Sequence, residues 1–371
     1  MRLGVLGAGQ LGRMLAQAAS RLGVRCRLYD PASDACAGDV AEVVCGSFED
    51  EAALARFCDS VDVVTIEFEN VPVEAAECVG RYAPIRPGVA ALQAAQDRLH
   101  ERRLLAEAGF ATPESEAIDS LESLEQAVAR RQCPLILKTR RFGYDGKGQA
   151  WIHALRDVES AWARLAGRSL MLDQGVNFDR EISLLAVRGL DGQVMHYPPA
   201  ENVHRDGILW TSCAPARMDA AVLDAARRRM EAMLDRLAYV GVVAVEFFEV
   251  GGTLLANEMA PRVHNSGHWT MDGAQTSQFE NHVRAVLGLP LGSTEARGSA
   301  GMVNLIGNAP PLEQLLRDGR AHVHLYGKAP RPGRKIGHVN FCEPDERSRD
   351  ERMSALHAVL EGAQADVRSA G

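Results

Sequence analysis

Short apolar runs alternate with helical patterns over residues 1–95, and this alternation limits the folds open to the chain more than any other feature. The apolar runs lie at 3–6, 25–30 and 61–66, and Leu11 and Met14 follow the first run at helical spacing. Strands separated by helices are typical of a parallel sheet with helices on both faces. The first part of the chain is therefore expected to be α/β.

The first run leads into Gly7-Ala8-Gly9-Gln10-Leu11-Gly12, which matches the pattern G-x-G-x-x-G between a strand and a helix. Asp30 ends the next run, so the turn has the acidic residue of a dinucleotide fingerprint as well. The mechanics are more general, because glycines permit a tight turn and a helix N-terminus attracts any anion. Two interpretations stay open here: an NAD site, or a turn that is merely tight or receives a different phosphate.

A second glycine-rich segment lies in the middle of the chain. Lys138 ends the apolar run 134–138, and the segment 143–149 (GYDGKGQ) follows it. The backbone N–H groups of such a flap can close over phosphate oxygens. It is not a Walker A loop, because Lys147 is followed by glycine rather than Ser or Thr. The alternative is a mobile glycine loop without a role.

The run 169–176 reads as an apolar strand whose backbone can face a purine edge, and Glu181 follows where it can accept hydrogen bonds from ribose hydroxyls. A single glutamate of this kind is more often a solvated surface residue.

Two glutamates stand alone in consecutive apolar runs. Glu246 lies in the run 239–248 and Glu258 in the run 254–262, with two glycines between the runs. An unpaired buried carboxylate costs several kcal/mol, so two in one hairpin indicate a shared cation, and hard oxygen ligands suit Mg²⁺. A three-residue turn at 251–253 would place both on one face, whereas a two-residue turn would not. The alternative is that each glutamate meets a separate arginine.

Charge and composition exclude some partners. The 371 residues include 41 Lys and Arg against 49 Asp and Glu, a net charge of −8, which gives no electrostatic footprint for nucleic acid. No apolar run approaches the ~20 residues of a membrane span, so no membrane partner is expected. A local basic cluster, Lys328, Arg331, Arg334 and Lys335, can still hold a small anion. The eight cysteines form no C-x-x-C pair and fit a reducing cytoplasm.

Together these motifs resemble the ATP-grasp superfamily and, more closely, the 5-(carboxyamino)imidazole ribonucleotide synthase family of purine biosynthesis. The resemblance covers nearly the whole chain, and its most specific segments are 4–14, 142–149, 202–209, 260–269 and 331–338. It implies three parts: a Rossmann-like domain at 1–95 whose glycine turn is not an NAD site, an α+β ATP-grasp domain at 96–292, and a small C-terminal domain at 293–371. It also implies a cytoplasmic, homodimeric ligase that uses ATP, Mg²⁺ and bicarbonate to carboxylate the exocyclic amine of 5-aminoimidazole ribonucleotide.

The resemblance implies roles for individual residues, which fall into four overlapping sets. The implied ATP contacts are Arg98, Lys138, Gly143, Tyr144, Asp145, Gly146, Lys147, Gly148, Gln149, Asp173, Gln174, Gly175, Val176, Glu181, His204, Asn257 and Glu258. The implied contacts of the aminoimidazole ribonucleotide are Glu69, Tyr144, Asp145, Arg262, His264, Lys328, Arg334 and Lys335. The implied Mg²⁺ ligands are Glu246 and Glu258, and the implied catalytic residues are Lys138, Asp145 and Arg262.

Two positions depart from the family pattern. Asp173 stands where the hinge usually has Glu, and Ala260 stands where many ATP-grasp enzymes have an Asn that would be a third metal ligand. Either Asp145 or Glu69 could position or deprotonate the amine. The rival functions are an NAD-dependent oxidoreductase, a related ligase that transfers formate or an amino acid, and a non-catalytic nucleotide-binding module.

Overall fold

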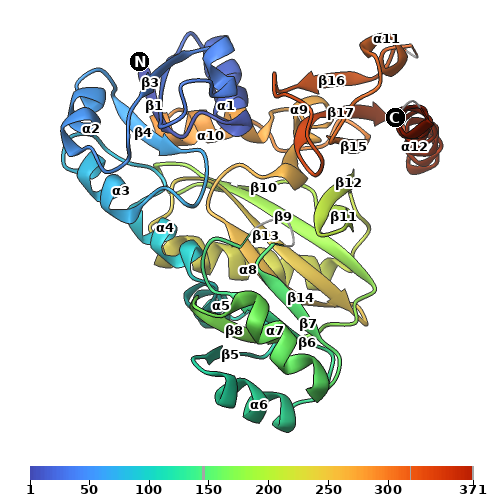
Figure 1. Cartoon of the computed structure of the whole chain (residues 1–371). Coiled ribbons are helices and arrows are strands. Elements are labelled where there is room, and N and C mark those ends of the chain that lie inside the picture. Colours follow the sequence, from blue (N-terminus) through green and yellow to red (C-terminus); the bar gives the residue numbers. More distant parts are fainter. Residues whose placement is uncertain (144–146, 318, 370–371) are drawn as a thin grey trace.

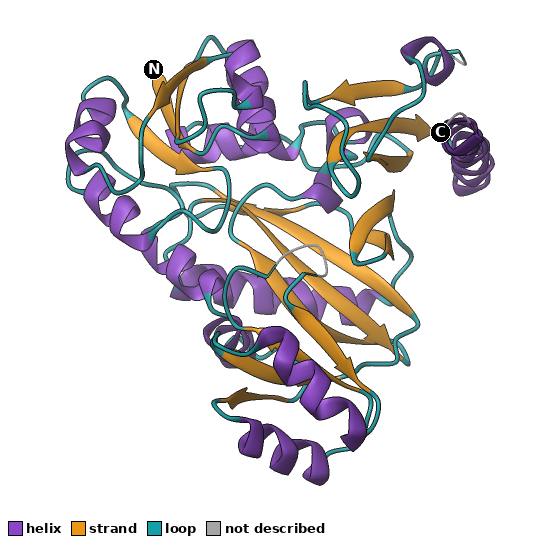
Figure 2. Cartoon of the chain, in the orientation of Figure 1, coloured by secondary structure: helices purple, strands orange, loops and turns teal. Residues whose placement is uncertain are grey.

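The computed structural model describes residues 1–143, 147–317 and 319–369, the side chains of the last helix only as far as residue 362. Within these residues the chain forms a four-stranded parallel sheet, a nine-stranded sheet and a second four-stranded sheet (Figures 1 and 2). None of the described helices is long and apolar enough to cross a bilayer.

The N-terminal sheet has the strand order β3-β2-β1-β4, with all neighbours parallel. Its strands are β1 (Arg2–Leu6), β2 (Arg25–Asp30), β3 (Glu42–Cys45) and β4 (Val63–Ile66). Helix α1 (Gln10–Arg21) packs Met14 and Leu15 with Val5 of one face. The helices α2 (Glu51–Cys58) and α3 (Val73–Gly80) pack in the core that contains Leu6 of the other face. The expected parallel sheet with helices on both faces is confirmed, although β3 was not expected as a strand.

The middle of the chain begins with two helices and a small antiparallel sheet of order β5-β8-β6-β7. The elements are α4 (Val89–Gln96), α5 (Arg98–Glu107), β5 (Ser115–Ile118), α6 (Leu121–Arg130), β6 (Leu135–Thr139), β7 (Gln149–Ile152), α7 (Val158–Leu165) and β8 (Leu170–Gln174). Leu124 of α6 and Val158 of α7 join the buried core of this sheet. This unit faces the large sheet across the site described below.

The large sheet has the order β14-β13-β9-β11-β12-β15-β17-β16, and β10 pairs with β9. Its central elements are β9 (Arg180–Arg188), β10 (Val194–His196), β11 (Ala200–Arg205), β12 (Ile208–Ala214), β13 (Gly241–Val250) and β14 (Thr253–Ala260). Helix α8 (Ala220–Arg236) lies along this sheet (Figure 1), and its Met230 and Leu234 belong to the same buried core as Val243 and Val245 of β13. Helix α10 (Gln278–Leu287) belongs to a second buried core, which also contains Val242 and Ala244 of β13. It also contacts α1, and this contact connects the large sheet to the N-terminal domain.

The C-terminal segment continues the same sheet. Its elements are β15 (Ser299–Ile306), α11 (Leu312–Leu315), β16 (His322–Leu325), β17 (Lys335–Glu343) and α12 (Glu346–Ser369). The strand β17, not expected from the sequence, pairs with both β15 and β16. One face of α12 is packed against the sheet, because Met353 and Leu360 are buried in the core beneath β15 and β17.

Candidate active site

Two clefts meet beside the β13–β14 hairpin. The first cleft, of 430 Å³, lies between the small sheet and the large sheet and is lined by Lys138, Glu181 and Glu246 among others. The second cleft, of 340 Å³, lies between the N-terminal domain and the hairpin and is lined by Glu69 and Arg262 among others. Five residues line both clefts: Arg98, Glu258, His264, Asn265 and Lys335. A group that bridges two ligands would therefore lie at this junction.

The two hairpin glutamates lie opposite each other, but not for the expected reason. The turn has two residues, because Val250 pairs with Thr253, so a three-residue turn is wrong. A register shift follows: Phe247 pairs with Ala256 and Glu246 pairs with Glu258, which leaves Asn257 as an extra residue on β14. Such a bulge puts two residues of one strand opposite one of its partner. With a two-residue turn and no bulge, Glu258 would lie on the face opposite to Glu246. The bulge shifts the register by one residue, so that both glutamates lie on the same face.

The two glutamates carry like charges, and one cation, Arg98, pairs with only one of them, Glu258. Burial and the charge of Glu258 raise the pKa of Glu246 to about 7. Burial acts in the same direction on Glu258, but Arg98 outweighs it and lowers the pKa of that carboxyl. Arg98 Nη1 lies 3.1 Å from Glu258 Oε2, while the nearest recorded partner of Glu246 is His264 Nδ1 at 3.8 Å. The alternative interpretation required a separate arginine for each glutamate. Among the described residues Glu258 has one, Arg98, whereas the ion-pair partner of Glu246 is a histidine.

Lys138 is held by a buried carboxylate. Asp173 Oδ2 lies 2.8 Å from Lys138 Nζ and 3.1 Å from Arg102 Nη2, and Ser115 Oγ donates to Asp173 Oδ1 at 2.6 Å. Burial would raise the pKa of Asp173, but the two cations lower it to about 2. Burial lowers the pKa of Lys138, and Asp173 counteracts it. The side chain of Asp173 thus holds Lys138 charged at the wall of the first cleft.

The remaining expected residues of the first cleft lie on β8, β9 and β11. Glu181 Oε2 lies 2.6 Å from His204 Nδ1, and both side chains line the cleft. Burial would lower the pKa of His204, but the hydrogen bond to Glu181 raises it above its ordinary value. Gln174 Nε2 donates to the Gln132 carbonyl at 2.8 Å, so this side chain ties the hinge segment to the loop before β6. Val176 and the stacked rings of Phe178 and Phe248 supply an apolar wall.

The glycine-rich flap is described in part. Tyr144, Asp145 and Gly146 lie outside the described residues. Gly143 accepts a hydrogen bond from Arg98 at 3.3 Å, and the Gly148 carbonyl accepts from the Thr139 N–H at 2.8 Å. Gly148 needs its glycine, because its φ is +73° and a Cβ would lie 2.6 Å from Thr139 Oγ1. Lys147 is exposed, and Gln149 begins β7 opposite Lys138.

The second cleft brings together residues from distant parts of the chain. Arg262 Nε donates to Glu69 Oε2. Burial would raise the pKa of Glu69, but Arg262 lowers it, so Glu69 is an ionised partner rather than a strong base. Burial and Arg262 lower the pKa of His264 to about 3, which leaves this imidazole neutral at physiological pH. His264 Nδ1 lies 2.8 Å from Ser266 Oγ.

The basic cluster lies at the edge of the second cleft. Lys328 Nζ donates to the amide oxygen of Gln10, which lines this cleft. Burial lowers the pKa of Lys328, and the charges of Arg334 and Lys335 lower it further, so these three cations influence one another. Lys335 lines both clefts, whereas Arg334 donates to the Ala329 carbonyl at 3.3 Å and lies outside both linings.

Two residues that line the second cleft were not expected from the sequence. The amide atoms Oδ1 and Nδ2 of Asn265 are buried without a hydrogen-bond partner among the described residues, although Asn265 lines both clefts. Glu101 of α5 accepts the N–H of Met259, and burial with the charge of Glu258 raises its pKa to about 8. Asn265 lies within one of the most specific sequence segments, so its neighbourhood could have pointed to it. Glu101 carries no such signal, because it reads as one polar position of a helix.

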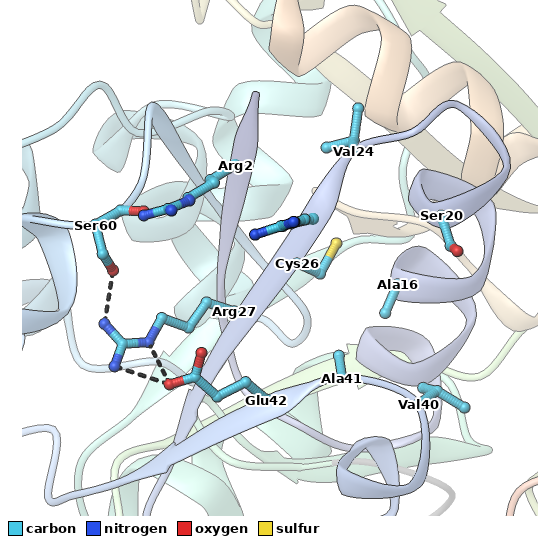
Figure 3. A pocket seen from close by; sticks show the side chains of 11 residues that line it. Arg2, Ala16, Ser20, Val24, Cys26, Arg27, Val40, Ala41, Glu42 and Ser60 are labelled. Carbon is cyan, nitrogen blue, oxygen red and sulfur yellow. Dashed lines mark hydrogen bonds and ion pairs between the residues drawn. The ribbon is translucent and has the colours of Figure 1, made fainter.

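A separate hollow of 560 Å³ lies at the edge of the N-terminal sheet (Figure 3). Arg27 Nε donates to Glu42 at 2.9 Å and Arg27 Nη1 to Ser60 Oγ at 2.6 Å, so this arginine is already occupied. Within the described chain, none of the expected site residues lines this hollow. The two clefts at the hairpin are therefore the candidate active site.

Comparisons with known proteins agree with this arrangement. A model of the ATP-grasp domain matches residues 103–279, one of the ribonucleotide synthetase preATP-grasp domain matches 1–96, and one of the phosphoribosylaminoimidazole carboxylase C-terminal domain matches 300–352. The N5-carboxyaminoimidazole ribonucleotide synthase of Pseudomonas aeruginosa is 44% identical over 361 residues, which are 97% of this chain and 100% of the relative. The chain belongs to the N5-carboxyaminoimidazole ribonucleotide synthase family. It is therefore an ATP-grasp ligase.

Solved structures of this synthase family have the same fold. The enzyme of Thermus thermophilus superposes with a TM-score of 0.92 at 50% identity, over 96% of this chain and 98% of that one. The enzyme of Aspergillus clavatus, in complex with ADP and 5-aminoimidazole ribonucleotide, superposes with a TM-score of 0.89 at 30% identity, over 97% of this chain and 98% of that one. The expected three-part α/β architecture and the family resemblance are confirmed.

Proposed function

We propose that the chain carboxylates the exocyclic amine of 5-aminoimidazole ribonucleotide at the expense of ATP and bicarbonate, giving 5-(carboxyamino)imidazole ribonucleotide, ADP and phosphate. The observation that carries this proposal is the meeting of two clefts at Arg98, Glu258 and His264. A phosphoryl group activated in one cleft and an amine held in the other would react at this junction.

ATP occupies the first cleft in this account. Lys138 and Arg98 neutralise its phosphates, and the flap from Gly143 to Gln149 covers them. The strand and hinge at Asp173, Gln174, Gly175 and Val176 face the base; because the Asp173 side chain is buried against Lys138, its contact is through the backbone. Glu181 and His204 reach the ribose. Asn257, the bulge residue, also lines this cleft.

Glu246 and Glu258 fit Mg²⁺. Two hard carboxylates lie opposite each other, and burial together with the charge of Glu258 raises the pKa of Glu246, so a cation held by the pair would relieve that repulsion. The described residues contain no group of three or more His, Cys, Asp or Glu side chains that could hold a metal. Mg²⁺ nevertheless suits the pair, because it is usually bound by one or two carboxylates together with phosphate oxygens and water. When bound it supplies charge neutralisation at the phosphates.

The reaction then has two steps. A bicarbonate oxygen attacks the γ-phosphorus of ATP, the bond to the β–γ bridging oxygen breaks, and carboxyphosphate and ADP result. The C–O bond of carboxyphosphate breaks to give phosphate and CO₂, and the amine captures the CO₂ and loses a proton. Lys138, Arg98 and Arg262 stabilise the negative charge of these steps, and the closed flap keeps water from carboxyphosphate.

The ribonucleotide occupies the second cleft. Glu69, paired with Arg262 and held ionised, orients the amine. His264, which lines the same cleft, is a further contact of the ribonucleotide. Asp145, which lies outside the described residues, is then the candidate that removes the amine proton, and Tyr144 is a further expected contact of the ribonucleotide. Lys328, Arg334 and Lys335 hold the 5′-phosphate, since an arginine fork and two lysines suit phosphate oxygens.

The other inferences belong to the same proposal. We divide the chain into domains at 1–95, 96–292 and 293–371, supported by the separate N-terminal sheet and by the family-model matches. A homodimer and a cytoplasmic location follow from the family resemblance.

The test is ADP release measured with bicarbonate, formate or neither, each with and without aminoimidazole ribonucleotide. Release that needs bicarbonate and rises with the ribonucleotide supports the proposal. Release stimulated by formate and not by bicarbonate would assign the chain to a related ligase instead.

A further inference from the structure

The glycine-rich turn at residues 7–12 is occupied by a side chain of the same protein. Glu67 follows β4 directly, and its carboxylate accepts the N–H of Gly9 at 3.0 Å and the N–H of Leu11 at 3.1 Å. The side chain is buried, with 7% of the residue exposed. In dinucleotide-binding proteins the corresponding N–H groups at the helix N-terminus bind a pyrophosphate.

The glycines of the motif make room for this carboxylate. A Cβ on Gly9 would lie 2.5 Å from Glu67 Oε1, and a Cβ on Gly7, whose φ is +102°, would lie 2.6 Å from Glu67 Oε2. The third glycine, Gly12, serves helix–strand packing, since its Cβ would lie 2.8 Å from Leu28. Larger residues at positions 7 and 9 would therefore collide with Glu67 itself, not with a ligand.

The acidic residue of the fingerprint is occupied as well. Asp30 Oδ2 accepts the N–H of Ala8 at 2.8 Å, and Asp30 Oδ1 accepts the N–H of Ala32 at 2.8 Å. Its carboxylate stabilises the turn and the loop after β2. The motif that resembles an NAD site is thus complete without a nucleotide.

Burial raises the pKa of the Glu67 carboxyl, and the N–H groups of the turn together with the charge of Lys328 oppose that rise. We propose that the Glu67 carboxyl group takes the place of a phosphate at the N-terminus of α1 and thereby positions the second cleft. The expected effect on the KM for the ribonucleotide rests on the proposed function, whereas the stabilisation of the turn by Glu67 does not. Glu67 links the end of β4 to the turn, and both linked segments line the second cleft, with Glu69 in the segment after β4 and Gln10 in the turn. Glu69 pairs with Arg262, and Gln10, between the two N–H donors, accepts from Lys328. Glu67 is a positioning residue for these contacts.

The test uses two variants that separate the charge from the space. Glu67→Ala removes the carboxylate and leaves a space of about the size of acetate. Glu67→Gln is the matched control, because its amide fills the space but turns an NH₂ group toward one of the two N–H donors. The melting temperature of both variants and of the unsubstituted protein is measured in sodium acetate and in sodium chloride of equal concentration, on the order of 100 mM.

We expect both substitutions to lower the melting temperature by at least about 2 °C, because two buried N–H groups lose their acceptor in Glu67→Ala and one of them loses it in Glu67→Gln. Acetate should restore at least half of the loss in Glu67→Ala and have no specific effect on Glu67→Gln or the unsubstituted protein. Both variants should raise the KM for aminoimidazole ribonucleotide at least fivefold and leave the KM for ATP within twofold. Acetate should reverse the KM change in Glu67→Ala alone, which a purely structural loss would not do.

Wild-type melting temperature in Glu67→Gln would overturn the proposal, and this variant decides if Glu67→Ala does not fold. A folded Glu67→Ala protein that responds equally to acetate and chloride would also overturn it. If the chain fails to carboxylate the ribonucleotide, the melting temperatures still report on Glu67, so the two failures are distinguishable.

Discussion

Replacing Asp173 by Asn removes the carboxylate that two buried cations share. A carboxyl whose pKa falls from 3.8 to about 2 contributes about 2 kcal/mol to the free energy of unfolding at neutral pH. Because the pKa of the folded state is the lower one, this contribution is complete above about pH 4 and disappears as the pH falls through about 2. The variant also removes the carboxylate that Lys138 and Arg102 both contact, and breaking such a buried pair costs about 3–5 kcal/mol.

We therefore expect Asp173→Asn to lose about 2–5 kcal/mol in urea unfolding at pH 7, and less when compared with the wild type near pH 3. Burial lowers the pKa of Lys138, and Asp173 is the anion that opposes this effect, so the lysine of the variant loses charge as the pH rises. The kcat/KM for ATP should fall at least about tenfold at pH 8, which is 1.4 kcal/mol, and recover in part at lower pH.

The matched control is Asp235→Asn, which breaks a surface pair with Arg188. Asp235 is 71% exposed at its side chain, so its loss should cost about 0–1 kcal/mol and leave the kinetics for ATP unchanged. An Asp173→Asn protein as stable as this control, with an unchanged pH profile for ATP, would refute the assigned role of the buried pair.

Glu258→Gln and Glu246→Gln should each remove most ATP turnover and leave the melting temperature near that of the wild type; ADP release at ordinary Mg²⁺ concentrations checks this, and wild-type turnover would contradict the metal site. Arg334→Ala should raise the KM for aminoimidazole ribonucleotide about ten- to a hundredfold, or roughly 1.4–2.8 kcal/mol, and change the KM for ATP little. Lys335→Ala should raise the KM for both substrates, because Lys335 lines both clefts. Titration with NADH should give no fluorescence enhancement, since Glu67 and Asp30 occupy the glycine turn; micromolar binding that Asp30→Ala abolishes would reverse this interpretation.

The hairpin shows how far the sequence could lead. Two isolated glutamates in apolar runs predict a facing pair, and the structure pairs them. The turn length and the bulge at Asn257 could not be predicted. A two-residue turn with a bulge and a three-residue turn without one place the two glutamates on the same face, so the alternation of side chains does not distinguish them. The N-terminal sheet was predictable because its apolar runs and helical spacings are regular, whereas the short, half-exposed β3 carries no such pattern.

The contacts that join distant segments were beyond sequence reasoning. Asp173 was expected to act through its backbone, yet its side chain binds Lys138, 35 positions earlier in the chain. The occupation of the glycine turn by Glu67 joins positions 58 residues apart, and the motif is compatible with either an external or an internal anion. The amide of Asn265, which has no hydrogen-bond partner among the described residues, becomes noticeable only when the two clefts are seen to meet around it.

The central claim is that bicarbonate, not water, attacks the γ-phosphate of ATP at the junction of the clefts. It is tested by supplying bicarbonate labelled with ¹⁸O, together with ATP and aminoimidazole ribonucleotide, and measuring the label in the released phosphate at reaction times short compared with exchange into water. The oxygen that attacks phosphorus stays on phosphorus when carboxyphosphate breaks its C–O bond. We predict one labelled oxygen in each phosphate formed. Phosphate without label, at the same rate of ADP release, would contradict the account.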